Sequence, residues 1–165
     1  MTNRYHATPY DIHASGFYFT TYEEFKSKAA EHRNALEEPV EEYEIQFIDG
    51  DNHTLFEAVG VNQANLEAWF DHWEDLGDSE QIQALALFEH GYSAEQVLEQ
   101  YDEVSVFEGT VTEWAEEFIA GCYDLSTLPG NLAHYIDFEA FGRDCELEGS
   151  ITTLVIHGTH YVLTL

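Results

Sequence analysis

The stretch Asn62-Gln-Ala-Asn-Leu-Glu-Ala-Trp-Phe-Asp-His-Trp-Glu-Asp-Leu-Gly-Asp78 carries two patterns at once. Its apolar side chains recur at the three- and four-residue spacing of a helix face, and Gly77 is typical of a helix end. We therefore expect a helix over 62–77 with an apolar stripe of Leu66, Trp69, Phe70 and Trp73. Another face of this helix carries acids, at positions i, i+4, i+7, i+8 and i+11: Glu67, Asp71, Glu74, Asp75 and Asp78.

This acidic face contains no lysine, although like charges at i and i+4 destabilise a helix by roughly 0.2–0.5 kcal/mol per pair. A helix that needed only solubility would place Lys opposite Glu. Further acids without basic partners follow on later predicted helices, at Glu95, Glu99, Asp102 and Glu103, then at Glu113, Glu116 and Glu117, and at Asp124. We expect these acids and those of the first stretch to form a partner-binding surface.

The charge is divided unevenly along the chain. Residues 1–33 are formally neutral, and they contain Arg4, Lys26, Lys28 and Arg33. The remaining residues contain 29 of the 33 acids and one base, Arg143, so they carry the whole formal charge of −28. Because self-repulsion opposes compaction, such a polyanion indicates a basic partner or a solvent that tolerates the charge.

The composition favours a folded, non-membrane chain. It is 44% hydrophobic and 15% aromatic, which is enough to bury a core, whereas disordered chains are poor in both. It has no apolar run long enough to span a membrane and no secretory signal. The two cysteines, Cys122 and Cys145, have no close pairing, as expected of reduced thiols in a cytoplasm. The negative charge argues against direct binding of nucleic acid.

Local patterns outside 62–77 predict an α+β fold. We expect two short strands within 6–19, a helix that begins after Thr21 with a Thr21–Glu24 capping box and ends by Pro39, and a strand over 43–47. A helix over 79–91 and a short helix opened by a Ser93–Gln96 box should follow.

The last third should contain a strand over 104–107, a helix opened by a Thr110–Glu113 box, and a helix over 131–141. A terminal hairpin should pair 151–156 with 161–165. These elements predict an elongated molecule of three small subdomains in line. They are an N-terminal sheet with one helix (1–60), a central helical unit (61–103) and a C-terminal α/β unit with the hairpin (104–165).

No motif for catalysis or for a cofactor is present. His157 and His160 form the only close histidine pair, and zinc would need two further ligands. The segment that begins at Asp49 fails as a calcium loop, because Thr54 and Gly60 stand where Gly and Glu are required. We expect no enzyme activity, no cofactor and no metal. We expect Arg143 to brace carboxylates with its two-pronged guanidinium group, within the fold or across an interface.

Three functions are compatible with this charge. The first is imitation of DNA: duplex DNA carries one charge per roughly 1.7 Å of axis, and helices with carboxylates every ~6 Å on neighbouring rows can approach that density. The second is an acidic interaction module for another basic DNA-binding protein. The third is a hydrolase or metal protein with a salt-adapted surface, although such adaptation should not leave residues 1–33 neutral.

One segment resembles a known family. The run Leu128-Pro-Gly-Asn-Leu-Ala-His-Tyr-Ile-Asp-Phe-Glu-Ala-Phe-Gly-Arg-Asp144 is similar to a segment of the ArdA-type antirestriction proteins. The pattern is carried by Leu132, Tyr135, Ile136, Asp137, Phe138, Ala140, Phe141, Arg143 and Asp144. The runs at 60–70 and 106–109 and the turn at His157 agree with it.

The resemblance implies a small protein of mobile DNA elements that has no catalytic activity. Such proteins occupy the DNA-binding groove of type I restriction–modification enzymes with carboxylates placed as a bent B-form duplex places phosphates. They pair as homodimers through the C-terminal domain. By this resemblance the motif residues have structural or dimer-contact roles.

Overall fold

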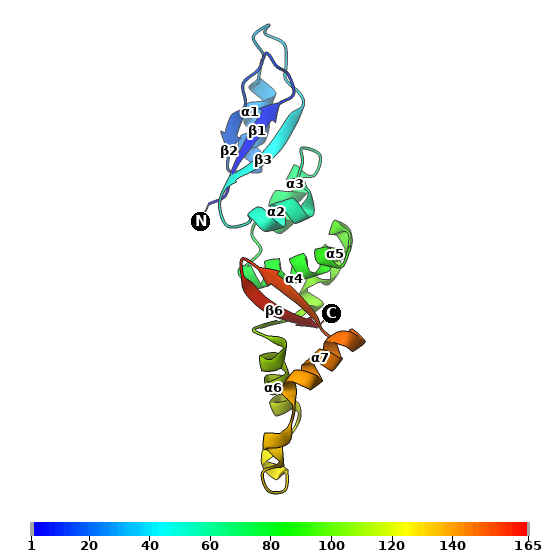
Figure 1. Cartoon of the computed structure of the whole chain (residues 1–165). Coiled ribbons are helices and arrows are strands. Elements are labelled where there is room, and N and C mark those ends of the chain that lie inside the picture. The colour runs from blue at the N-terminus through cyan, green and yellow to red at the C-terminus, as the bar shows by residue number, and fades with distance from the viewer. Residues whose placement is uncertain (1, 165) are drawn as a thin grey trace. The chain divides into compact units, whose positions relative to one another are not determined.

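A computed structural model describes residues 2–164, and it has the predicted mixed α+β class (Figure 1). The chain separates into two compact units, residues 1–77 and residues 78–165, here called unit 1 and unit 2. Each unit contains one three-stranded antiparallel sheet with its own helices. The division into three subdomains stays a prediction.

Unit 1 is built on the sheet β2-β1-β3, which confirms the strands expected near the N-terminus. Its strands are β1 (Arg4–Pro9), β2 (Phe17–Phe19) and β3 (Tyr43–Asp49). Side chains of the central strand alternate, so that Tyr5 and Ala7 are fully buried while Arg4 is exposed. Helix α1 (Tyr22–Glu31) contributes the buried Phe25 to the same core.

The start of α1 confirms half of the predicted capping box. The Thr21 hydroxyl accepts a hydrogen bond from the Glu24 backbone N–H at 3.2 Å. The Glu24 carboxylate, however, accepts from the backbone N–H of Thr20, at 2.8 Å, and not from that of the cap residue. The helix ends at Glu31, well before the predicted stop at Pro39.

The predicted helix over 62–77 is wrong in its extent and in its type. The structure has a short α3 (Leu66–Ala68) that continues directly into a π-helix, η1 (Trp69–Trp73). The π-turn holds one residue more than an α-turn. The sequence pattern also missed α2 (His53–Val59), a helix too short to show a clear period.

The core of unit 1 is aromatic. The ring of Tyr5 contacts those of Phe19, Phe47, Phe56, Trp69 and Phe70, with centroids 5.4–6.5 Å apart. Its hydroxyl accepts a hydrogen bond from Trp69 Nε1 at 2.8 Å. Large rings bring much apolar area per residue, which compensates for the small size of the unit.

Unit 2 begins with helices that agree with the sequence patterns. They are α4 (Asp78–Glu89) and α5 (Ala94–Gln100), followed by the 3-10 turn η2 (Tyr101–Glu103). The Ser93–Gln96 capping box is formed in both directions. Together α4 and α5 bury Leu85, Leu87 and Val97.

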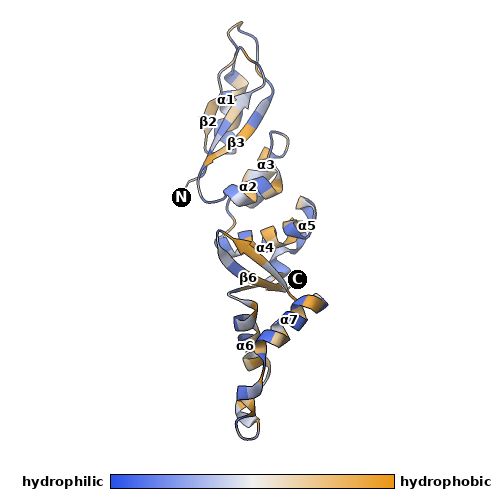
Figure 2. Cartoon of the chain, viewed as in Figure 1, coloured by the Kyte–Doolittle hydropathy of each residue, from blue (hydrophilic) through white to orange (hydrophobic). Residues whose placement is uncertain are grey.

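The rest of unit 2 contains the sheet β4-β6-β5, and the strands near the label β6 carry hydrophobic residues (Figure 2). Its strands are β4 (Ser105–Glu108), β5 (Thr152–Ile156) and β6 (Thr159–Thr164). The last two form the predicted hairpin, through a turn in which His157 and Gly158 have φ of 50° and 84°. Residue 165, the predicted end of the second strand, lies outside the described residues.

Between β4 and β5 the chain forms two packed helices with a loop segment between them. Helix α6 (Val111–Cys122) starts with the predicted Thr110–Glu113 box, which is formed in both directions. The 3-10 turns η3 (Leu125–Thr127) and η4 (Leu132–Tyr135) then lead to α7 (Phe138–Glu148). The predicted helix over 131–141 is therefore wrong. Asp137 starts a new helix, and Gly149, with φ of 80°, caps its C-terminal end.

Helices α6 and α7 are in close contact at Gly142. A Cβ at this position would lie 2.5 Å from Val111 Cγ1 and 2.9 Å from the Val111 carbonyl oxygen. Only glycine allows this contact without movement of the backbone.

The helices formed by residues 2–164 are too short or too polar to cross a bilayer.

Candidate functional site

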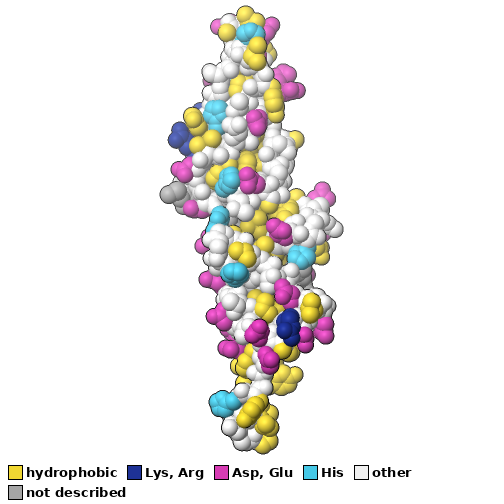
Figure 3. Space-filling view, in the orientation of Figure 1, with side chains coloured by type: hydrophobic (Ala, Val, Ile, Leu, Met, Phe, Trp, Pro, Cys, Tyr) yellow, Lys and Arg dark blue, Asp and Glu magenta, His cyan; other side chains and the backbone are white. Residues whose placement is uncertain are grey.

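The predicted acidic residues reach solvent with one exception. Glu74 is half-buried, whereas the other predicted acids are exposed: Glu67, Asp71, Asp75, Asp78, Glu95, Glu99, Asp102, Glu103, Glu113, Glu116, Glu117 and Asp124. Figure 3 shows acidic side chains distributed along the visible face, with few basic ones. These exposed residues form the candidate acidic surface.

Glu74 has a structural role within unit 1. Its Oε1 accepts hydrogen bonds from the Tyr5 hydroxyl at 2.8 Å and from Asn3 Nδ2 at 3.4 Å. Asn52 Nδ2 donates to the Glu74 backbone carbonyl at 2.6 Å. Burial raises the pKa of the Glu74 carboxyl, and the bonds from Tyr5 and Asn3 oppose that rise. Glu74 therefore ties β1 to the end of the π-helix.

The five acids of 67–78 do not form one continuous helical stripe as predicted. Glu67 is on α3, Asp71 is in the π-helix and Asp75 lies in the turn after it. Asp78 lies in the first turn of α4, in unit 2. The spacing that would align them in one α-helix is lost because the α-helical period is not maintained through 69–77.

Three of the acids after position 90, at the C-terminal end of α5, oppose the dipole of that helix. Glu99 stands near the C-terminal end of α5, and Asp102 and Glu103 follow in η2. A helix C-terminus carries partial negative charge, so an acid there costs about 0.3–1 kcal/mol at low ionic strength. Helices α4 to α7 have no basic residue in their last turns. This arrangement favours a negative surface at the expense of stability.

Four carboxylates line an open groove at the start of α6. The groove has a volume of about 670 Å³, and its lining includes Glu113, Glu116 and Glu117 of α6. The lining also includes Glu108 of β4 and His160 of β6. Neither residue was predicted for this surface, because strand pairing brings both of them there: the Gly109 backbone N–H donates to the His160 carbonyl at 2.9 Å.

Two of the surface acids also cap helical segments, which keeps them charged. Glu113 Oε2 accepts from the Thr110 backbone N–H at 2.8 Å and from its hydroxyl at 2.9 Å. Asp124 Oδ1 accepts from the Ser126 backbone N–H at 3.0 Å. The Thr110 and Ser126 bonds lower the pKa of the two carboxyls, so both are ionised over the neutral range.

The family-motif residues fall into two groups. Asp137 Oδ1 accepts from the Ala140 backbone N–H at 2.9 Å and so caps α7. Phe138 and Phe141 are half-buried, and the ring of Phe141 stacks with that of Trp114, 6.4 Å away. In contrast, Leu132 and Tyr135 are 51% and 77% exposed, so neither belongs to the core of unit 2.

Arg143 does not brace carboxylates within the fold as expected. It lies inside α7, and its ion pair is a 3.9 Å contact between its Nε and Oδ1 of the adjacent Asp144. Both side chains are largely exposed, so the pair contributes little. The carboxylates of unit 2 therefore rely on solution ions, or on a partner, for most of their neutralisation.

Among residues 2–164, no three His, Cys, Asp or Glu side chains are grouped so that they could hold a metal ion.

Comparison with models of protein families gives a match over most of the chain. The family model described as antirestriction protein (ArdA) matches residues 6–160. No curated protein matches the chain.

Proposed function

The chain belongs to the ArdA family of antirestriction proteins, and we propose that it blocks type I restriction–modification enzymes by imitating the charge of B-form DNA. In this proposal its carboxylates occupy the basic groove that otherwise binds phosphates. Mobile DNA that encodes the protein would then escape cleavage on entering a cell.

The observation that carries the proposal is the near absence of basic residues after position 33. After position 33 the chain has 29 of its 33 acids and a single base. The described acids of unit 2 are mostly exposed, and Arg143 forms only a long contact with its neighbour. A groove lined with Lys and Arg that binds phosphates every few ångströms would meet a similar density of charge here.

The proposed mechanism is collective and involves no chemical step. Many carboxylates meet many basic side chains, so association should be fast and strongly weakened by salt. Glu95, Glu99, Glu116 and Glu117 suit this role, because they are exposed on α5 and α6. Glu74 does not, since its carboxylate is hydrogen-bonded inside unit 1.

We also propose that the protein acts as a homodimer in the cytoplasm. Unit 2 exposes large apolar side chains on α6, on the segment after it and on η4: Phe118, Tyr123, Leu132 and Tyr135, which are 44–77% exposed. Apolar residues of this kind dominate permanent interfaces. The two cysteines are free thiols, which suits a reducing compartment.

The decisive assay is DNA cleavage by a purified type I restriction enzyme, with and without this protein, over a series of salt concentrations. We expect stoichiometric inhibition that weakens with salt and that excess duplex DNA overcomes. A folded preparation that fails to inhibit at low salt would refute the proposal for that enzyme. It would then favour an acidic module for another basic DNA-binding protein.

Charge neutralisation tests the collective mechanism. Asp71→Asn alone should change inhibition less than about threefold, because one surface charge contributes little. Replacing Glu95, Glu99, Glu116 and Glu117 together by Gln should weaken inhibition at least about tenfold at low salt and reduce its salt dependence. The matched control replaces the same four residues by Asp, which keeps the charge. A single substitution that abolished inhibition in a folded protein would contradict the mechanism.

A further inference from the structure

The end of unit 1 formed by two loops presents three large apolar side chains to solvent. Ile12 is 91% exposed, Tyr10 is 68% exposed and Leu36 is 64% exposed. Tyr10 and Ile12 lie in the loop between β1 and β2, and Leu36 lies between α1 and β3. We call these three residues the tip patch. Single exposed apolar residues are ordinary, but three on adjoining loops indicate a contact surface.

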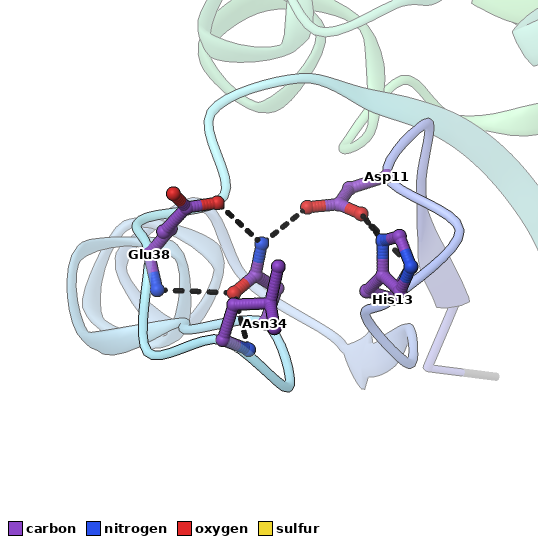
Figure 4. Close-up of polar contacts among 5 residues, drawn as sticks. Asp11, His13, Asn34 and Glu38 are labelled. Atoms are coloured by element: carbon purple, nitrogen blue, oxygen red, sulfur yellow. Dashed lines mark hydrogen bonds and ion pairs between the residues drawn. The ribbon is translucent and has the colours of Figure 1, made fainter.

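The two loops are held together by a buried amide (Figure 4). Asn34 is 7% exposed, and its Nδ2 donates to Asp11 Oδ2 at 2.7 Å and to Glu38 Oε2 at 3.3 Å. Its Oδ1 accepts from the backbone N–H groups of Leu36 and Glu38, at 2.8 and 3.0 Å. A bond from the Ala35 N–H to the His13 carbonyl, at 2.9 Å, joins the same loops.

These bonds place the apolar side chains but do not bury them. Ile12 stands between Asp11 and His13, which both bond to the second loop, and Leu36 follows directly after Ala35. Glu37 adopts a left-handed backbone, with φ of 64°, which is strained for a residue other than glycine. The loop therefore keeps a strained backbone conformation although the side chain of Leu36 is not buried in the core. Preorganised loops of this kind lower the entropy cost of binding.

The surroundings of the tip patch indicate the kind of partner. A groove of about 370 Å³ beside Tyr10 is lined by Asp11, Glu41 and Glu42 among others. The Asn34 amide bond lowers the pKa of the Asp11 carboxyl, so this carboxylate is charged at neutral pH. The acids complement a basic protein surface.

We propose that the tip patch docks into an apolar recess bordered by lysine or arginine side chains on the inhibited DNA-binding enzyme. This rests on the proposed function and adds a contact that DNA itself cannot make. Ile12 and Leu36 enter the recess, and the carboxylates of the neighbouring groove take the basic side chains. The tip patch supplies binding that does not depend on salt, whereas the acidic surface supplies binding that does.

The test measures the dissociation constant for a purified type I enzyme at low and high salt, with the full-length protein. The double variant Ile12→Ser, Leu36→Ser should bind at least about tenfold more weakly, by the same factor at both salt concentrations. Both side chains are exposed, so the variant should fold normally. The matched control is Ile48→Ser, because Ile48 is 45% exposed in β3 and outside the tip patch. The control should bind within about twofold of wild type.

A second variant distinguishes the effect of the loop conformation from that of the apolar side chains of the tip patch. Asn34→Ala keeps Tyr10, Ile12 and Leu36 but removes the hydrogen bonds that hold the loops, so binding should weaken less than in the double variant. Tip variants that bind as tightly as wild type, or a loss that disappears at high salt, would overturn the inference alone. If wild type itself does not bind, the proposed function fails, and this inference fails with it.

Discussion

Tyr5→Phe isolates the polar chain in the core of unit 1. The Tyr5 hydroxyl accepts from Trp69 Nε1 and donates to Glu74 Oε1, both at 2.8 Å. Phenylalanine keeps the aromatic ring but removes this oxygen. The fully buried Trp69 N–H then has no partner, and the half-buried Glu74 carboxylate keeps only the 3.4 Å contact with Asn3.

The size of the effect follows from these two losses. A buried donor without a partner costs about 1–3 kcal/mol, and a hydrogen bond to a charged group is worth about 1.5–3 kcal/mol. Because Glu74 is partly open to water, the second figure is an upper one. We expect the free energy of unfolding of unit 1 to fall by about 2–5 kcal/mol, a large share of the stability of a small domain.

The loss should depend on pH. Burial raises the pKa of Glu74 above its unfolded value, so the folded state holds the proton more tightly. The resulting stability is present at low pH and is lost as pH rises through the folded pKa. Tyr5→Phe removes a bond that opposes the rise, and so it raises this pKa further. The difference between variant and wild type should therefore shrink as pH falls from about 7 to about 5.5.

Urea unfolding followed by tryptophan fluorescence, at the two pH values, measures the free energy of unfolding of unit 1. Replacing Trp114 by Phe in every variant leaves Trp69 and Trp73, both in unit 1, as the reporters. Tyr10→Phe is the control, because that side chain is 68% exposed, and it should change stability by less than about 0.5 kcal/mol. A loss below about 1 kcal/mol for Tyr5→Phe, equal at both pH values, would refute the reasoning.

Two further predictions concern unit 2. Gly142→Ala places a Cβ against Val111 and should destabilise unit 2 by about 1–3 kcal/mol. Gly121→Ala in α6 is the comparison: its Cβ meets nothing within 4 Å, so it should stabilise unit 2 by up to about 1 kcal/mol. Urea unfolding followed by Trp114 fluorescence compares the two variants, and equal effects would contradict the close contact at Gly142. Replacing the exposed Leu132 and Tyr135 together by Ser should shift the mass measured by light scattering from a dimer towards the 18.9 kDa monomer, while an unchanged dimer would place the interface elsewhere.

Elements specified by neighbouring residues could be predicted from the sequence. The Ser93 and Thr110 capping boxes form as expected, because cap and partner are three residues apart. The terminal hairpin also forms, because a tight turn at His157 and Gly158 joins two apolar strands. The mixed α+β class followed from the same local signals.

Features that depend on tertiary contacts could not be predicted. The apolar spacing over 62–77 is typical of an α-helix, but in the structure Trp69 and Trp73 are buried in the core from a π-helix. Exposure of most surface acids was predictable, because carboxylates seldom leave water. The exception, Glu74, pairs with Tyr5, which is 69 residues away in the sequence. The hydrogen bonds of Asn34 join two loops, and no apolar or polar repeat in the sequence predicts that these loops lie side by side.

Because basic residues are scarce, amine-reactive reagents and trypsin act at few positions of the chain. Lysine occurs only in α1, at Lys26 and Lys28, so an amine-reactive probe labels unit 1 and leaves unit 2 unmarked. Trypsin has a single cleavage position after residue 33, at Arg143, in the interior of α7. Proteases cut where a helix opens, so the appearance of this one fragment reports the local unfolding of α7. A single lysine introduced in unit 2 would be the one lysine of that unit to which a crosslinker to a bound enzyme could attach.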